Sequence, residues 1–467
     1  MNAAGNTQKK RTHWVLILAG LAVEALYILY RVIPSTPAPA VIKYMLVYAG
    51  AFILVTVTFF LCKSQENTRF FFITVVFFAI LYGITLAAAP PDQSDDIYRY
   101  LWDGKLQYYG ISPYTYAPAD PALLRYHSAA LPALVNFPQI KTIYPPAAQL
   151  LFRLSYTLFG ESVTGMKCVF FLALLGSTCF FYALLKARGA EARWLLFFAW
   201  NPLVIMETAV NGHLDIVMAF FVLAALWFFD KHKLIYSGIA LACAVLTKMI
   251  PIILAPLFFF FILRTGTGKS PEAPVVSAPI KPLVNAMTRF YIPFISTITG
   301  FYLLYAESAQ NMFHTAFNYS TTWYFNNPLF DMIHLIFKKN AAAHAVSFSV
   351  FLILYIIVTL SPLERDRKII TAVAVFVVCN PTIHPWYLVI LLALLCLHRG
   401  AALVMWSGMV VITYFVVYQY KLTGVWRESW IILLIEYLPV LFLLIWRRYP
   451  HTPPNPLTSS PITETSE

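Results

Sequence analysis

Long apolar runs separated by short polar segments occupy the chain from about residue 14 to residue 446. Fourteen runs can be marked, although several are shorter than the roughly 20 residues that a straight helical span requires. We therefore expect an all-α polytopic membrane protein with about 14 transmembrane helices, in a range of 11–14 because neighbouring short runs can merge or re-enter. The runs are 14–33, 42–62, 69–89, 162–186, 194–210, 214–229, 234–248, 250–263, 290–306, 346–361, 369–382, 385–397, 402–418 and 430–446.

Four segments depart from this alternation of span and short loop. Residues 90–160 form a first large loop, 307–345 form a second loop rich in aromatic residues and histidine, and 264–288 form a Gly/Ser/Pro-rich linker. Residues 449–467 are predicted to be a disordered tail. We expect a single integral-membrane domain over residues 1–448, without an appended soluble domain.

The first large loop carries signals for two helices. Ser94 can cap a helix that runs to about Tyr109 and stops at Gly110. A second helix is predicted to begin at Pro146, since proline suits the first helical turn, and to end at Gly160. The second helix is apolar with few charges, so we expect it to lie along the membrane surface.

The charge pattern predicts how the chain is oriented. The chain is 60% hydrophobic and 12% charged, and its net charge of +12 is not gathered into a basic stripe that could bind nucleic acid. With the amino terminus inside, 20 of the 33 lysines and arginines fall in cytoplasmic segments. We therefore expect both termini in the cytoplasm and the loop 90–160 facing outward, in the plasma membrane of a bacterium.

The polar residues at the start of the first loop are the strongest candidates for chemistry. Asp96, Arg99 and Asp103 share one face of the predicted helix, and Asp95 lies four residues before Arg99. A salt-bridged surface helix is the alternative. The position directly after a span favours function, because a carboxylate can act as general base on a sugar hydroxyl and an arginine can neutralise a phosphate.

Three further polar groups are expected at the same face. Glu207 lies inside an apolar span, and His213 and Asp215 lie at a turn that follows it. These could form a hydrogen-bonded turn without function. Lys248 ends a span, where it either reaches towards lipid headgroups or holds a lipid-linked phosphate. His384 lies between two prolines, next to Trp386 and Tyr387, which an aromatic belt would explain.

These residues resemble the signatures of the integral-membrane glycosyltransferases of the GT-C fold, in the polyprenyl-phosphomannose-dependent mannosyltransferase branch. The resemblance covers about residues 70–260. It differs from many members in placing three spans before the acidic loop, and in carrying Leu214 where asparagine is more frequent. The matching motifs are the run from Asp95 to Gly104, Gly110-Ile111-Ser112-Pro113-Tyr114, Tyr144-Pro145-Pro146, Asn201-Pro202 and Asn211-Gly212-His213-Leu214-Asp215.

The resemblance implies transfer of a hexose, expected to be mannose, from a polyprenyl-phosphate donor to an extracytoplasmic glycolipid, glycan or lipid. Single displacement would invert the anomeric centre. Asp96 is the first choice for the general base and Asp95 the second, and the donor phosphate needs a cation because it gains charge as it leaves. The candidate phosphate-binding residues are Arg99 and Lys248, and the candidate substrate-binding residues are Tyr98, Asp103, Glu207, His213, Asp215 and His384.

No cofactor is expected. The six cysteines lie within or at the ends of apolar runs without CxxC spacing, which indicates neither a disulfide framework nor a zinc site. A divalent metal between Asp95, Asp96 and Asp215 is an alternative to the metal-free site that we favour. No glycine-rich pattern for a nucleotide sugar is present.

A transporter or flippase for a lipid-linked sugar is the competing function. The sequence shows no repeat of two halves and few charges in mid-membrane, both of which many secondary transporters have. A polysaccharide polymerase or ligase would share the large outer loop but is expected to favour arginine-rich loops over a pair of aspartates.

Overall fold

The computed structural model describes residues 3–62, 69–265 and 280–446. Within these ranges the chain is helical, and its only β pairing is an isolated bridge between Phe325 and Thr382. The predicted all-α class is therefore confirmed. The predicted tail 449–467 and residues 266–279 of the predicted linker lie outside the described residues.

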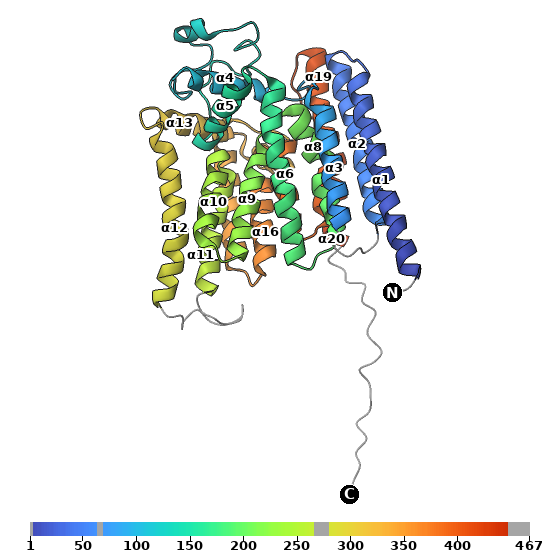
Figure 1. The fold of residues 1–467 in the computed structure, drawn as a ribbon. Coiled ribbons are helices and arrows are strands. Elements are labelled where there is room, and N and C mark those ends of the chain that lie inside the picture. Colours follow the sequence, from blue (N-terminus) through green and yellow to red (C-terminus); the bar gives the residue numbers. More distant parts are fainter. Residues whose placement is uncertain (1–2, 63–68, 266–279, 447–467) are drawn as a thin grey trace.

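Three long helices precede the acidic segment, as the sequence predicts. They are α1 (Ala3–Val32), α2 (Pro37–Leu61) and α3 (Arg69–Ala87). Figure 1 shows them side by side at one edge of a helical bundle, with α4 (Asp96–Tyr108) and α5 (Pro146–Phe159) across one end. We call this the upper end; α1 begins and α20 (Trp430–Trp446) ends at the lower end.

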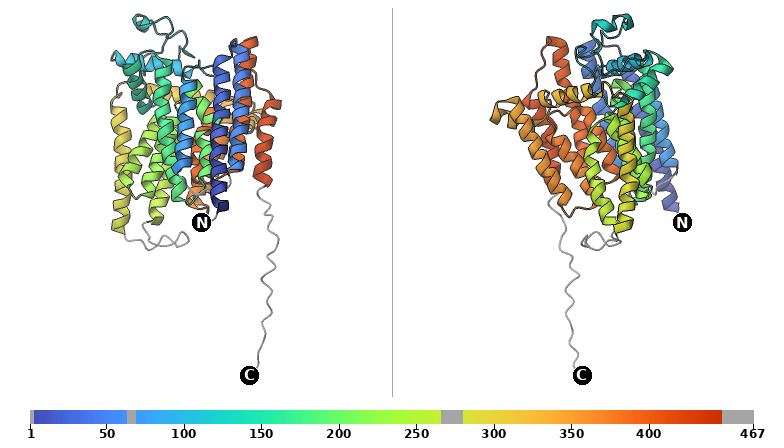
Figure 2. Two further views of the ribbon diagram at one scale, coloured as in Figure 1. Left: turned by 45° about the vertical axis from the view of Figure 1, so that its right-hand side comes forward. Right: turned by 90° about the vertical axis from the view of Figure 1, so that its left-hand side faces the viewer.

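The remaining helices complete the bundle, and the further views in Figure 2 keep α4 and α5 at the upper end. These helices are α6 (Val163–Ala187), α7 (Leu196–Ala199), α8 (Pro202–Met206), α9 (Asp215–Asp230), α10 (Leu234–Thr247), α11 (Leu254–Thr265), α12 (Ile280–Leu303), α13 (Ala309–Thr322), α14 (Pro328–Phe337), α15 (Asn340–Leu360), α16 (Arg365–Cys379), α17 (Val389–Ala393), α18 (Ala401–Met409) and α19 (Phe415–Thr423). Short 3-10 or π segments are η1 (Pro121–Tyr126), η2 (Ala192–Leu195), η3 (Glu207–Asn211), η4 (Ile250–Ile253), η6 (Pro385–Leu388), η7 (Leu394–Cys396) and η8 (Val410–Tyr414).

Six helical stretches among the described residues are long and apolar enough to cross a membrane. They are Thr12–Val32, Pro37–Leu61, Arg69–Ala87, Val163–Ala187, Asn340–Leu360 and Ala401–Thr423. The expected count of about 14 is not confirmed, because several apolar runs are broken. The run 194–210, for example, is divided at Asn201-Pro202, where proline cannot continue the preceding helix.

The two helices of residues 90–160 form close to their predicted bounds. The N-cap of α4 is Asp95 and not the predicted Ser94, and it makes no side-chain capping bond. The Ser94 hydroxyl accepts a hydrogen bond from the Asp96 amide at 3.3 Å. Gly110 and Gly160 adopt positive φ of 77° and 62° after the helices. Helices α4 and α5 pack tightly, because a Cβ on Gly104 would lie 2.4 Å from the Phe152 carbonyl oxygen. The loop signals therefore predicted both helices.

An ionic cluster joins three helices at the lower end. Arg188, which follows α6, forms ion pairs with Asp230 at 3.0 Å and with Asp366 at 2.5 Å. Arg365 adds pairs to both carboxylates, at 2.9 and 3.0 Å. This lower cluster ties α6, α9 and α16 together.

Candidate functional site

The segment between α8 and α9 forms a sharp corner that places polar side chains beside α4. The Asn201 side chain accepts a hydrogen bond from the Leu203 amide at 2.9 Å and caps α8. A π turn follows, and Gly212 ends it with a φ of 72°. A Cβ on Gly212 would lie 2.3 Å from Ile97 Cδ1, so only glycine fits both the conformation and the close approach of α4.

Glu207 is fully buried, and both oxygens of its carboxylate have polar partners. Its Oε1 accepts from the hydroxyls of Tyr44 at 2.8 Å and Tyr414 at 2.6 Å. Its Oε2 accepts from Asn211 Nδ2 at 3.0 Å and lies 2.8 Å from His213 Nδ1. A carboxylate at this distance favours a proton on Nδ1, which leaves Nε2 of neutral His213 as an acceptor.

The Asp96 carboxylate lies opposite this imidazole. His213 Nε2 is 3.8 Å from Asp96 Oδ2, and Asp96 Oδ1 accepts a hydrogen bond from Asn136 Nδ2 at 2.9 Å. The Asp96 side chain is 22% exposed, so it can be reached from outside the protein. The corner and the first turn of α4 therefore face each other across one acidic site.

Asp95 differs from its neighbour. Its side chain is at the surface, yet the surrounding protein excludes enough water to raise the pKa of its carboxyl. The positive charge of Lys421 opposes this shift, and the negative charge of Asp96 adds to it. Tyr98, one turn of α4 from these carboxyls, is half-buried, and burial with the charges of Asp95 and Asp92 raises its pKa.

A partly buried ion pair lies next to the acidic site. Lys248 Nζ is 2.7 Å from Asp215 Oδ1, and the same ammonium lies 4.2 Å above the ring of Tyr387. Asp215 Oδ2 is buried and has no hydrogen-bond partner. The Lys248 side chain is 18% exposed, whereas that of Asp215 is 1% exposed.

The carboxyl-terminal half of the chain contributes a stack of rings. The Trp386 indole lies between two imidazoles, 3.7 Å from the His213 ring and 4.4 Å from the His384 ring, with interplanar angles of 17° and 6°. Burial, with Lys248 and His213 nearby, lowers the pKa of His384 to about 3. His384 is therefore neutral at ordinary pH and offers hydrogen bonds rather than charge.

Arg99 and Asp103 pair with each other within α4. Arg99 Nε lies 2.9 Å from Asp103 Oδ1, and its Nη1 donates to the Ile140 carbonyl at 2.8 Å. Asp103 Oδ2 accepts from Gln149 Nε2 at 2.9 Å. The pair thus holds α4 against α5 and the segment before it, while Arg99 Nη2 stays buried without a partner.

Several residues at the site were not predicted from the sequence. Asn136 holds Asp96, Tyr44 and Tyr414 hold Glu207, and Trp386 stacks on His213. Gln93 is buried, its backbone N–H donates to Asn211 Oδ1 at 3.3 Å, and both polar atoms of its side-chain amide lack a partner. Gln93 could have been selected from the sequence, because it lies three residues before Asp96 in a polar stretch. The other four residues have no such signal.

Five predicted site residues thus lie together in the structure: Asp96, His213, Asp215, Lys248 and His384. The side chains of Arg99, Asp103 and Glu207 mainly contact other groups of the protein. Among the described residues, no three side chains of His, Cys, Asp or Glu lie together in a way that could hold a metal ion.

The family model for the amino-terminal domain of alpha-(1->6)-mannopyranosyltransferase matches residues 17–264. No curated protein and no solved structure was found to match the chain. The matched residues include α4, the corner before α9 and Lys248, which supply most of the site. The chain therefore belongs to the alpha-(1->6)-mannopyranosyltransferase family and is a membrane glycosyltransferase.

Proposed function

We propose that the protein transfers mannose from a polyprenyl-phosphate donor to a hydroxyl of a glycan or lipid acceptor, with inversion, at an upper end that faces outward from the plasma membrane. The observation that carries this proposal is the juxtaposition of a partly exposed carboxylate, Asp96, with the partly exposed cation of Lys248. Two residues link them: His213, in the turn before α9, and Asp215, the first residue of α9. The family match gives no support to a transporter or flippase.

Asp96 acts as the general base. As the acceptor oxygen bonds to the anomeric carbon, its proton moves to the Asp96 carboxylate. Asn136 fixes one oxygen of that carboxylate, so that the other faces His213. Because Glu207 holds the imidazole through Nδ1, His213 Nε2 can accept a hydrogen bond from the carboxyl once it is protonated.

Lys248 acts on the leaving group. The bond between the anomeric carbon and the donor oxygen breaks, and the polyprenyl phosphate departs with the electron pair and one more negative charge. An ammonium suits this phosphate as a point charge, and Asp215 holds it in place. Arg99 Nη2 is buried and has no hydrogen-bond partner, so Arg99 is the second candidate for the phosphate.

The test uses purified protein in nanodiscs with polyprenyl-phosphate mannose labelled in the sugar. Asp96→Asn keeps the shape but removes the base, so kcat should fall by roughly 10²–10⁴-fold. Asp120→Asn makes the same chemical change in the loop above, where the Asp120 side chain only caps η1, and should retain wild-type activity. Equal activity of the two variants would reject Asp96 as the base.

The outward orientation has a separate test. Cysteine at Asp120, in the loop of the upper end, should react with an impermeant thiol reagent added to intact cells. Cysteine at Lys231, which follows α9 at the lower end, should react only after the cells are opened. Reversed labelling would place the site on the cytoplasmic side and remove the argument for a lipid-linked donor.

A further inference from the structure

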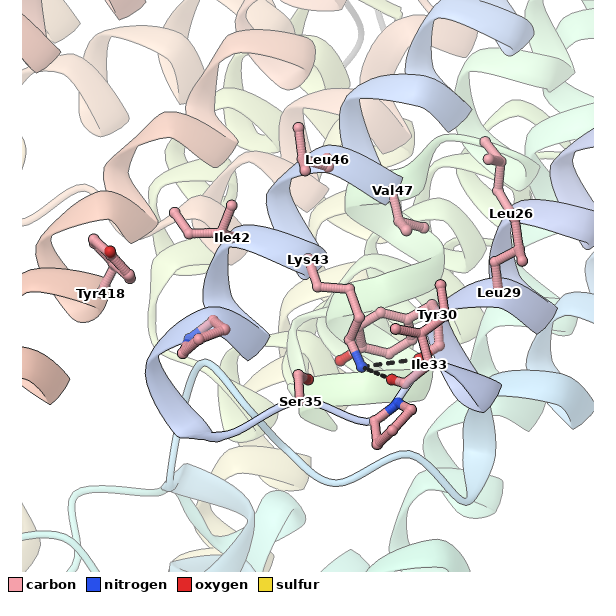
Figure 3. A pocket seen from close by; sticks show the side chains of 12 residues that line it. Leu26, Leu29, Tyr30, Ile33, Ser35, Ile42, Lys43, Leu46, Val47 and Tyr418 are labelled. Atoms are coloured by element: carbon pink, nitrogen blue, oxygen red, sulfur yellow. Dashed lines mark hydrogen bonds between the residues drawn. The ribbon is translucent and has the colours of Figure 1, made fainter.

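A groove of about 570 Å³ lies between α1, α2 and α19, away from the catalytic residues. Its lining is mainly apolar, and Figure 3 shows side chains of α1 and α2 with Tyr418 of α19 around it. Leu46 is 68% exposed and Leu29 is 47% exposed, so the groove is open at the surface. Both α1 and α2 are long enough to span a membrane, which places this opening against lipid.

One cation, Lys43, is part of the lining. Its ammonium donates to the carbonyls of Tyr30 at 3.0 Å and Ile33 at 2.8 Å, and lies 4.7 Å from the centre of the Tyr30 ring. These contacts cap the carboxyl end of α1, where a positive charge is favoured. An ammonium has three N–H groups, so capping leaves one donor and the charge itself for another partner.

Cations outnumber carboxylates at the polar end of the groove. Asp92 is the carboxylate near Lys43, and its Oδ2 already accepts from the Tyr30 hydroxyl at 2.8 Å. Arg31 and Lys421 add two more cations, which donate to the carbonyls of Ala88 and Asp92. Asp95 lies near Lys421, so three cations (Lys43, Arg31 and Lys421) stand against two carboxylates (Asp92 and Asp95). The polar end of the groove therefore has a small excess of positive charge, while its walls are apolar.

We propose that this groove binds an anionic phospholipid of the surrounding leaflet. One acyl chain lies along the apolar walls, and a phosphate oxygen accepts the remaining N–H of Lys43. The donor phosphate is assigned to Lys248, at the end of α10, and Figure 1 shows α10 and α1–α2 on different sides of the bundle. The bound phospholipid is thus a second lipid, distinct from the substrate.

The bound lipid stabilises residues that contact the catalytic site from the side of α1 and α2. Tyr44, next to Lys43, donates to Glu207, and Tyr30 donates to Asp92, only four residues before Asp96. Four residues of chain reach at most about 14 Å. A phospholipid that orders the end of α1 and the start of α2 therefore stabilises the segment that carries the base.

Binding is measured without substrate, so the result does not depend on the proposed reaction. Native mass spectrometry of the full chain in detergent would compare phosphatidylglycerol with phosphatidylcholine of the same acyl chains. The wild type should retain one phosphatidylglycerol in preference. Lys43→Gln keeps a donor for capping but loses the charge, and should weaken that binding about fivefold without affecting phosphatidylcholine. Lys43→Arg should keep the preference.

A second pair of variants separates the groove from the capping role. Leu46→Trp fills the groove and leaves Lys43 in place, so it should weaken binding of phosphatidylglycerol even if Lys43→Gln fails to fold. Ile53→Trp is the matched control, because Ile53 lies on the same helix, is 60% exposed and is not among the residues that line the groove. Absence of a phosphatidylglycerol preference in the wild type, or equal binding by Leu46→Trp and Ile53→Trp, would leave Lys43 as a helix cap only.

Discussion

Two groups of ionic side chains lie at opposite ends of the bundle and differ in how completely their polar atoms are paired. At the lower end, Arg188 and Arg365 bridge Asp230 and Asp366, and none of these four side chains has a buried polar atom without a partner. The charges satisfy one another and join helices from both halves of the chain. This is the arrangement expected of a structural network.

The upper group leaves several buried polar atoms unpaired. They are His213 Nε2, Asp215 Oδ2, Arg99 Nη2 and both side-chain atoms of Gln93. A buried polar atom without a hydrogen bond costs free energy of folding, so these five atoms call for a partner. A ligand with many hydroxyl and phosphate oxygens would pair with them. Between these two groups of ionic side chains, the difference lies in how completely the polar atoms are paired and not in the presence of charge.

The largest expected effects come from exchanging one carboxylate in each group. Asp96→Asn should lower kcat by roughly 10²–10⁴-fold with little change in Tm. Asp366→Ala should lower the free energy of unfolding by roughly 1–3 kcal/mol, since it leaves Arg188 partly unpaired, and should spare kcat in the folded fraction. Activity assays and thermal melts of both variants check this. A large loss of activity at Asp366 with normal stability would remove the distinction.

Variants of Lys248 test whether its ion pair with Asp215 also stabilises the fold. Lys248→Ala should raise KM for the lipid-linked donor and lower kcat, about tenfold or more in kcat/KM, because the phosphate charge grows in the transition state. It should also lower Tm, because Asp215 loses its partner. Adding Asp215→Asn should restore Tm but not activity, and Lys248→Arg should be partly tolerated. Full rescue of activity by the double change would show that the pair serves only the fold.

A variant of Gln93 tests whether its unpaired side-chain amide binds the substrate. Gln93→Met replaces it with an apolar side chain of similar size, which removes two unsatisfied buried atoms, so Tm should stay the same or rise. If the amide pairs with a substrate hydroxyl, kcat/KM should fall about tenfold. Steady-state kinetics and a melt of the same sample give both values. A lower Tm with unchanged kinetics would make Gln93 a structural residue.

The smallest effect is a dependence of stability on pH. Burial raises the pKa of Glu428 to about 7, although its Oε2 accepts from the Asn326 amide at 2.7 Å. A carboxyl whose pKa is higher in the folded state than in the unfolded state favours folding while it is protonated. The contribution of Glu428 to the stability is therefore fully present below the ordinary pKa of 4.5 and is lost as pH rises through about 7. Glu428→Gln should flatten the change in Tm between pH 5 and pH 8. An unchanged pH profile would assign the titration elsewhere.

The sequence predicted features that depend on local signals. Proline at the start of α5, glycine after α4 and α5, and three apolar runs before the acidic loop all led to correct elements. The breaks within the apolar runs were harder to predict, because a π turn such as Glu207–Asn211 has no periodic pattern of apolar residues that marks it. That Asp96 and His213 lie close together was expected only because both were predicted at the same face of the membrane.

The partners of these residues could not be predicted, because they come from far along the chain. Tyr44 and Tyr414 meet on one oxygen of Glu207, although 370 positions separate them. Neither tyrosine differs from its apolar neighbours in any way that marks this contact. Trp386 was attributed to an aromatic belt, and only the packing of η6 on the corner reveals its place between two imidazoles.

Helix α10 is short, and its length bears on how deep Lys248 lies in the membrane. Its 14 residues span about 21 Å at 1.5 Å per residue, whereas the hydrocarbon core of a bilayer is about 30 Å thick. If α10 starts level with one boundary of this core, Lys248 lies about 9 Å inside the other. A donor phosphate would have to sink below the headgroups, or the bilayer would have to thin around the protein. The enzyme is thus expected to respond to bilayer thickness, and to work faster in thin membranes than in thick ones.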